Sequence, residues 1–138
     1  YYITRSLRFQ FSFKLTDWII ALGDFYQRGK KLAESIAEKL GFKPTLINPR
    51  FATGLDNTLL NNLKDNHNIV ITLEDGILDG GFGQKIASYF GNTNIKVKNY
   101  GLQKKFYDRY NPEELLKEEK MDSESIIEYI KRNINPII

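Results

Sequence analysis

The chain of 138 residues fits one domain, and its 41% apolar and 27% charged residues are ordinary values for a globular protein. Its 20 basic and 17 acidic residues are interspersed, so no basic stripe indicates a nucleic-acid partner. The absence of cysteine excludes a disulfide framework and thiolate chemistry, and it is consistent with a cytoplasmic protein. No apolar run reaches the ~18 residues of a membrane span and no signal-peptide pattern opens the chain, so we expect no membrane partner.

The first 17 residues differ in pattern from the rest of the chain. Phe9, Phe11 and Phe13 alternate with polar residues, which predicts a strand with one apolar face. We therefore expect an atypical strand or hairpin region at residues 1–17. Trp18–Leu22 follows and is typical of a buried strand.

An amphipathic helix is expected over Phe25–Leu40. Asp24 precedes it and can accept a backbone N–H as the N-cap, and Tyr26 falls in the first turn. Apolar residues recur along one face at helical spacing, and Gly41 stands where a left-handed residue commonly ends a helix. We assign the apolar face to the core.

The next pair of elements is a strand at Thr45–Asn48 and a short helix capped by Asp56. The inward-facing residues of this helix are expected to be Leu59, Leu60 and Leu63. His67 is the one histidine of the chain. Without a partner cluster, a lone histidine at a helix end indicates a structural role, and zinc or triad chemistry has little support.

The centre of the chain is a β-branched apolar run, Asn68–Leu73, which is typical of a strand buried on both faces. A turn containing Gly80, Gly81 and Gly83 follows, and a helix is expected from Gln84 to Phe90. A glycine-rich turn before a helix can cradle phosphate. The spacing matches neither the dinucleotide fingerprint nor the P-loop, so it favours a close-packing turn.

Glu74 lies between this strand and the glycine turn. A carboxylate there can accept hydrogen bonds from the backbone amides of the turn and lie in the positive field of the helix N-terminus. We therefore predict that Glu74 is a structural anchor of the turn.

The last third of the chain contains one strand and two helices. Ile95–Tyr100 alternates apolar with polar residues, which suits a strand near the sheet edge. Asn111 precedes Pro112 as a helix N-cap, and Asp122 caps a final helix. The buried face of that helix is expected to contain Ile126, Ile127, Ile130 and Ile134.

The alternation of strands and helices predicts an α/β fold, in which a mainly parallel sheet has helices on both faces. We find neither a repeat nor a linker, so a single domain is expected over residues 1–138.

Four groups of residues carry a family resemblance. They are Ala21–Asp24, Asn48–Phe51 with Leu55-Asp56, Glu74–Gly76 with Gly80–Gly83, and a tail of Tyr100–Leu102, Phe106 and Pro112–Leu116. In this order they resemble the C-terminal domain of the transketolase superfamily, and within it most closely the 1-deoxy-D-xylulose-5-phosphate synthases. The resemblance implies a three-layer α/β/α fold with a mixed five-stranded sheet, in which the first strand is antiparallel and the strand order is 1-3-2-4-5.

The resemblance also implies a function for the parent enzyme. Such a synthase uses thiamine diphosphate and magnesium to condense pyruvate with glyceraldehyde 3-phosphate, releasing carbon dioxide, for isoprenoid, thiamine and pyridoxal synthesis. The cofactor-binding motifs of the family lie in other domains, so no catalytic, cofactor-binding or metal-binding residue carries over to this chain. The resemblance thus implies a non-catalytic assembly domain whose partners are other domains or subunits, in a homodimer.

The family's strand order indicates where such partners would lie. The order reverses between Trp18–Leu22 and Ile69–Leu73, and ligands and partners of open α/β sheets favour the crevice at such a point. The candidate interdomain or structural loop residues are Asp24, Tyr26, Arg50, Asp56, Glu74, Gly80, Gly81 and Gly83.

Three alternatives stay open at this stage. Within the superfamily, the chain could be the C-terminal domain of a transketolase or of a 2-oxo-acid dehydrogenase β subunit. A free-standing phosphate- or nucleotide-binding module would instead bind its ligand at Gly80–Gly83. A small hydrolase has the least support, because no nucleophile motif accompanies the single histidine.

Overall fold

The computed structural model describes residues 2–3, 18–22, 25–49, 54–65, 67–108 and 111–133. Five strands form one sheet: β1 (Tyr2–Ile3), β2 (Trp18–Leu22), β3 (Thr45–Ile47), β4 (Ile69–Ile77) and β5 (Lys96–Leu102). Five helices accompany them: α1 (Phe25–Leu40), α2 (Asn57–Leu63), α3 (Phe82–Tyr89), α4 (Pro112–Glu118) and α5 (Ser123–Asn133). None of the helices in this described part is long and apolar enough to cross a membrane.

The sheet has the order β1-β3-β2-β4-β5, as the family resemblance implies. All four described pairings are parallel, including that of β1 with β3. The expected antiparallel first strand, and with it the mixed sheet, is therefore wrong for the described strands. Residues 4–17 separate β1 from β2, and a connection of this length, about a dozen residues or more, is what a parallel arrangement requires. The strand expected around Phe9–Phe13 lies outside the described residues.

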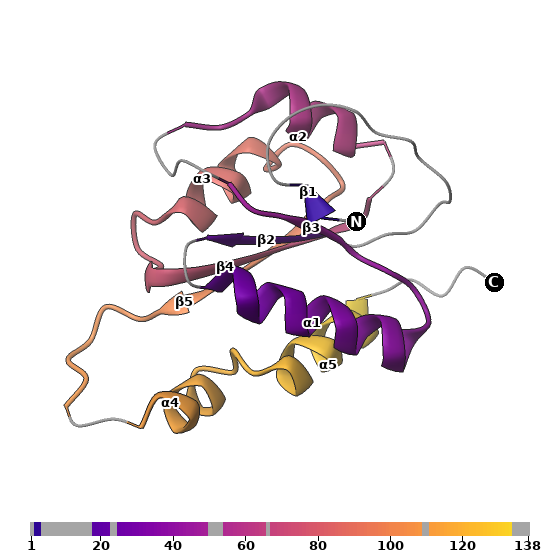
Figure 1. Cartoon of the computed structure of the whole chain (residues 1–138). Helices are drawn as coiled ribbons and strands as arrows, with labels where there is room; N and C mark the ends of the chain where they lie inside the picture. The colour runs from indigo at the N-terminus through magenta and orange to yellow at the C-terminus, as the bar shows by residue number, and fades with distance from the viewer. Residues whose placement is uncertain are drawn as a thin grey trace.

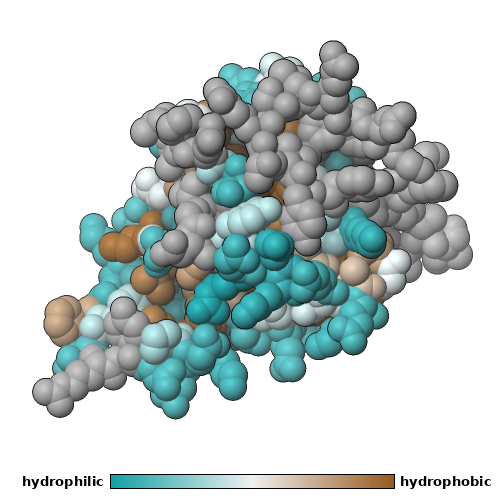
Figure 2. Space-filling model, in the orientation of Figure 1, coloured by the Kyte–Doolittle hydropathy of each residue, from teal (hydrophilic) through white to brown (hydrophobic). Residues whose placement is uncertain are grey.

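Helices cover both faces of the sheet, so the three-layer architecture is confirmed (Figure 1). Helices α2 and α3 lie on one face, and α1, α4 and α5 lie on the other. The solvent-facing side of α1 is hydrophilic, as expected for an amphipathic helix (Figure 2).

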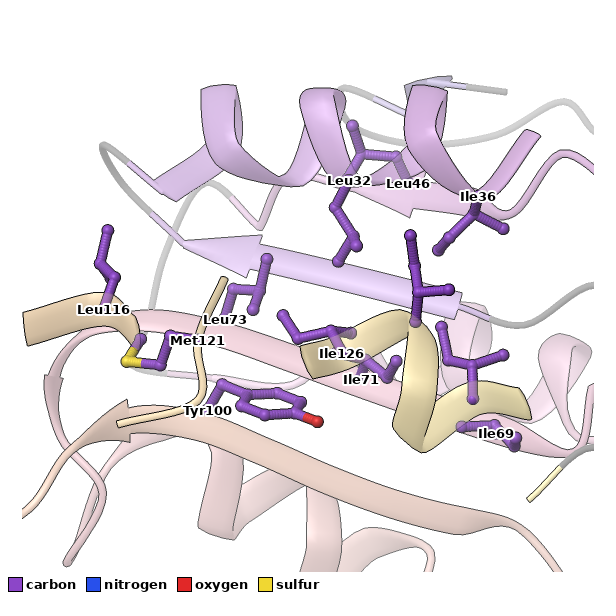
Figure 3. Close-up of a cluster of buried hydrophobic side chains, with 12 residues drawn as sticks. Leu32, Ile36, Leu46, Ile69, Ile71, Leu73, Tyr100, Leu116, Met121 and Ile126 are labelled. Carbon is purple, nitrogen blue, oxygen red and sulfur yellow. The ribbon is translucent and has the colours of Figure 1, made fainter. Parts of the chain in front are cut away.

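The core consists of two clusters because β4 presents alternate residues to opposite faces. Ile69, Ile71 and Leu73 point into the larger cluster, with α1 and α5, as Figure 3 shows for its labelled residues. Val70 points to the smaller cluster, which holds Ile47, Leu60, Phe82, Ile86 and Phe90. A strand buried on both faces was predicted here from its unbroken apolar run.

The helix ends follow from local chemistry. Helix α1 has the predicted bounds, and Gly41 adopts a φ of 78° with its N–H on the Ala37 carbonyl. The Asn111 side chain accepts the Glu113 N–H at 3.0 Å, and Asp122 accepts the Ser125 N–H at 3.1 Å. These contacts confirm the predicted caps of α4 and α5. Of the residues expected on inward helix faces, Leu60, Ile126, Ile127 and Ile130 are buried, Leu59 is half-buried, and the Leu63 side chain and Ile134 lie outside the described set.

Two boundaries differ from the sequence prediction. Strand β4 continues through Glu74 to Ile77, because Ile77 pairs with Leu102 of β5 after a register shift. Helix α3 begins at Phe82 instead of Gln84, with Gly81 as its N-cap and Gly83 in its first turn.

Candidate functional site

Glu74 lies in β4 toward the carboxyl end of the sheet, before the strand ends at Ile77 and the turn to α3 begins. It is 4% exposed, and its Oε2 accepts the backbone N–H of Gly83 at 2.7 Å. The donor is one of the first amides of α3, which have no partner inside the helix. This hydrogen bond confirms the predicted contact between Glu74 and the turn, although Glu74 belongs to the strand and does not follow it.

The glycines of the turn allow very close packing around this carboxylate. A Cβ atom on Gly81 would lie 1.9 Å from Glu74 Oε1 and 2.7 Å from the Ile77 carbonyl oxygen. A Cβ on Gly83 would lie 2.7 Å from atoms of both Thr72 and Asn99. Side chains cannot fit at these two positions without displacing their neighbours. The geometry therefore supports the close-packing interpretation of the glycine motif.

Gly80 is required in the same turn for its backbone conformation and not for close packing. Its φ of 73° lies in the left-handed region that favours glycine. Its N–H donates to Gln84 Oε1 at 2.9 Å, so a side chain in the first turn of α3 holds the preceding loop. A glutamine at the third helical position can reach back to the amides before the helix, but the sequence prediction started the helix at Gln84 and so missed this contact.

The turn does not fit a phosphate or diphosphate group. An incoming anion at Gly81 and Gly83 would meet the carboxylate of Glu74, which already accepts the Gly83 N–H. Two anions this close repel one another, and the buried amide can serve only one of them well. In addition, the described residues contain no group of three or more His, Cys, Asp or Glu side chains that could hold a metal ion. The turn therefore fits an internal anchor, with the Glu74 carboxylate in the place that a phosphate oxygen would take.

Two of the other candidates, Asp56 and Tyr26, lie in the described part of the chain. Asp56 accepts the Leu59 N–H at 2.9 Å and so caps α2. Its neighbour Leu55 shares a shallow hollow of about 560 Å³ with Gly80 and Gly81, so the start of α2 lies near the turn. Tyr26 is half-buried and packs against the larger core cluster. Asp24 and Arg50 lie outside the described residues.

His67 lies before β4, at the other end of the strand from Glu74. It is 4% exposed, and burial lowers the pKa of its imidazole to about 2. A group with such a pKa is a poor general base at neutral pH. The structural role predicted for His67 therefore has physical support.

Sequence reasoning missed three polar contacts near this edge. Thr72, which is 1% exposed, donates its hydroxyl to Asn99 Oδ1 at 2.6 Å and links β4 to β5. Glu119, at the end of α4, forms an ion pair with Lys105 at 2.6 Å and accepts the Tyr107 hydroxyl at 3.2 Å. The hydrogen bond to Glu119 raises the pKa of Lys105. The partners are far apart in the chain or have no recognisable spacing, so no sequence signal identifies them.

A second hollow, of about 630 Å³, lies between β5 and α5. Lys98 Nζ lies 5.7 Å from the Tyr100 ring centroid and 5.6 Å from that of Tyr129, and burial raises the pKa of Tyr100 to about 12. These cation–π contacts stabilise the protein's own side chains, and the lining contains neither histidine nor cysteine.

Comparison with known proteins agrees with the fold and with the motif order. The family described as "Transketolase, C-terminal domain" matches residues 18–126. The 1-deoxy-D-xylulose-5-phosphate synthase of Clostridium tetani is 32% identical over 116 residues, which are 83% of this chain and 19% of that protein. The synthase of the same name from Francisella tularensis subsp. novicida is 34% identical over 107 residues, which are 75% and 17% of the two chains.

A solved structure has the same fold. It is described as "Split gene transketolase, inactive beta4 tetramer", and it superimposes with a TM-score of 0.70 at 19% identity over 85% of this chain and 38% of its own. The chain thus spans about a fifth of the length of the curated relatives that it matches. With its match over residues 18–126, the chain belongs to the family of transketolase C-terminal domains.

Proposed function

We propose that this chain is the non-catalytic assembly domain of a thiamine-diphosphate-dependent 1-deoxy-D-xylulose-5-phosphate synthase. The parent enzyme would condense pyruvate with glyceraldehyde 3-phosphate and release carbon dioxide. The relatives named above support this parent over a transketolase or a 2-oxo-acid dehydrogenase β subunit, because those that cover most of the chain are synthases.

The observation that best supports the non-catalytic role is that the glycine turn before α3 is already occupied by the side chain of Glu74. The Gly83 amide, which could have received a phosphate oxygen, is taken by the buried carboxylate of Glu74. The same contact argues against the alternative of a free-standing phosphate-binding module. In this proposal thiamine diphosphate and magnesium bind elsewhere in the parent enzyme, and this chain's residues support assembly.

We place the assembly surface at the carboxyl edge of the sheet. The strand order reverses between β2 and β4, and open α/β sheets commonly receive ligands and partners at the carboxyl ends of the strands at such a point. The rim that contains Tyr26, Glu74 and the glycine turn would face another domain or subunit of a homodimeric synthase. Asp24 and Arg50 belong to this rim by their places in the sequence.

Two measurements test the proposal. Calorimetric titration of thiamine diphosphate with magnesium into the 138-residue chain should show no saturable binding, and the chain alone should form no product from pyruvate and glyceraldehyde 3-phosphate. Saturable micromolar binding would contradict the non-catalytic role. A complete protein that used a different acceptor or 2-oxo acid would contradict the proposed parent reaction.

A further inference from the structure

Two large apolar side chains are exposed to solvent in the part of the chain that the structure describes. Phe106 is 91% exposed and Ile77 is 48% exposed. Ile77 ends β4, and Phe106 lies in the segment that follows β5, so both belong to the carboxyl edge of the sheet (Figure 1). In Figure 2, hydrophobic atoms gather along the left margin, where the ends of these two strands lie. Single exposed apolar residues are common, so this exposure needs a second observation before it indicates a site.

The second observation is that the segment is held on both sides of the Phe106 ring. Lys105 Nζ lies 2.6 Å from Glu119 Oε1, and the Tyr107 hydroxyl donates to the same oxygen at 3.2 Å. The Tyr107 oxygen in turn accepts the Gln103 N–H at 3.0 Å. The Glu119 side chain is 5% exposed. Because Lys105 and Tyr107 both turn toward one buried carboxylate, Phe106 between them is directed into solvent.

The segment is also joined to the end of β4. The Leu78 N–H donates to the Leu102 carbonyl at 2.9 Å, and Ile77 lies opposite Leu102 in the pairing of β4 with β5. An ion pair of 4.0 Å joins Lys104 to Asp79 in the next turn. Phe106 and Ile77 thus belong to one corner of the molecule, which we call the β4–β5 corner (Ile77, Leu102 and Phe106).

We propose that the β4–β5 corner docks, with Phe106 as its anchor, into an apolar pocket on another domain of the same synthase polypeptide. This inference rests on the proposed function and identifies the contact that the carboxyl edge would make. The two lysines that precede Phe106 in the sequence, Lys104 and Lys105, each pair with a carboxylate of this chain. They are therefore already neutralised, and an apolar pocket complements the exposed phenyl ring.

The size of the corner distinguishes a tethered domain from a free partner. A phenylalanine buries about 150–250 Å², far below the ~1,200 Å² of total surface that a stable free complex requires. A second copy of the chain would therefore not be held by this corner alone. A domain on the same polypeptide has an effective concentration in the millimolar range and needs far less contact area. The curated relatives, of which this chain spans about a fifth, have room for such domains.

Hydroxyl-radical footprinting of Phe106 tests the proposal directly. The oxidation rate of its side chain is compared between the 138-residue chain and the complete synthase, with half-buried Tyr89 on α3 as the internal control. We expect Phe106 to react about tenfold more slowly in the complete protein, the change that ~1.4 kcal/mol of docking energy produces. Equal reactivity of Phe106 in the two proteins would overturn the proposal. Footprinting needs no turnover, so its result is independent of whether the parent reaction is correctly assigned.

A pair of variants separates docking from folding. F106S should leave the unfolding midpoint of the 138-residue chain unchanged, because the ring is almost fully exposed, yet it should speed proteolytic release of this domain from the complete synthase. Asp108→Ser, an exposed change in the same segment, is the matched control and should alter neither measurement. Unchanged release in F106S would overturn the proposal. Self-association of the isolated chain that F106S abolishes would overturn it in favour of a second copy as the occupant.

Discussion

Two glutamate side chains near the same end of the sheet are withdrawn from solvent, and they organise their surroundings in different ways. Glu74 accepts a backbone N–H from α3, and glycines bring the chain within contact distance of its carboxylate. Glu119 binds the side chains of Lys105 and Tyr107, the residues directly before and after Phe106, whose side chain is 91% exposed. The first arrangement encloses a carboxylate, whereas the second arrangement displays Phe106.

The difference shows that a buried carboxylate can fix tight packing, as Glu74 does, or hold a segment whose central side chain stays exposed, as Glu119 does. A backbone donor and missing Cβ atoms leave the Glu74 turn no room to adjust, so a ligand cannot enter without breaking it. Side-chain donors on a loop hold the segment but leave the residue between them free to contact something else. We therefore assign stability to the Glu74 turn and recognition to the segment held by Glu119.

The largest expected effect comes from filling the enclosed site. Gly81→Ala places a Cβ against Glu74 Oε1 and the Ile77 carbonyl, and the backbone oxygen cannot move aside easily. We expect the free energy of unfolding to fall by about 3 kcal/mol, at the upper end of overpacking effects. Urea denaturation of both proteins measures the change.

The control for Gly81→Ala is Gly76, a glycine near the end of β4. Gly76 has open space around its Cβ position and no positive φ. Gly76→Ala should therefore change the free energy of unfolding by no more than ~0.5 kcal/mol. Equal losses in the two variants would mean that the glycines serve chain flexibility and that close packing is not the reason for them.

Removing the enclosed carboxylate should have a smaller effect. Glu74→Ala leaves the buried Gly83 N–H without its acceptor, which costs ~2 kcal/mol of unfolding free energy. Exposed Asp75→Ala is the adjacent control and should be neutral. An unfolding midpoint and slope equal to those of the wild type in Glu74→Ala would show that the carboxylate is dispensable for the turn.

The sequence predicted those features that depend on local chemistry. The bounds of α1 followed from a cap position, an apolar stripe and Gly41, and the contact of Glu74 followed from a carboxylate placed before a helix N-terminus. The extension of β4 to Ile77 was missed because Gly76 indicates a turn by itself. Pairing with Leu102 of β5, a partner distant in sequence, overrides that local preference.

The contacts of Glu119 that hold the segment around Phe106 were not predictable either, because they too join residues distant in sequence. The Glu119 contacts join residues 12 or more positions apart, across the whole of α4, and no spacing rule connects them. Phe106 entered the sequence analysis only as a residue of the family resemblance. Its exposure emerges only from the folded structure, since an isolated phenylalanine in a sequence is more often buried.

The buried imidazole of His67, at the other end of β4 from Glu74, should make the stability of the chain depend on pH. Burial lowers the pKa of His67 from 6.5 to about 2, so protonation favours the unfolded chain below pH 6.5. Stability should be complete above that pH and should be lower by ~1.4 kcal/mol at pH 5.5. Urea midpoints at pH 7.5 and 5.5 measure the loss, which His67→Gln should abolish. If His67→Gln loses the same stability between pH 7.5 and 5.5, the acid-sensitive group is not His67, and it should be sought at the carboxyl edge of the sheet.

The smallest effect is expected in the segment around Phe106 that Glu119 holds. It concerns local order more than global stability. Glu119→Gln removes the charge that pairs with Lys105 and weakens the acceptor of the Tyr107 hydroxyl. The Gln103 amide depends on Tyr107, so its hydrogen exchange should become about threefold faster while the unfolding midpoint hardly changes. Glu118→Gln changes the exposed neighbouring residue and should leave the hydrogen exchange of the Gln103 amide as it is.

Because the loosened segment would no longer direct Phe106 outward, Glu119→Gln in the complete synthase should also weaken the protection of the Phe106 ring from oxidation. Faster exchange with undiminished protection would mean that docking itself, and not the Glu119 contacts, orders the segment.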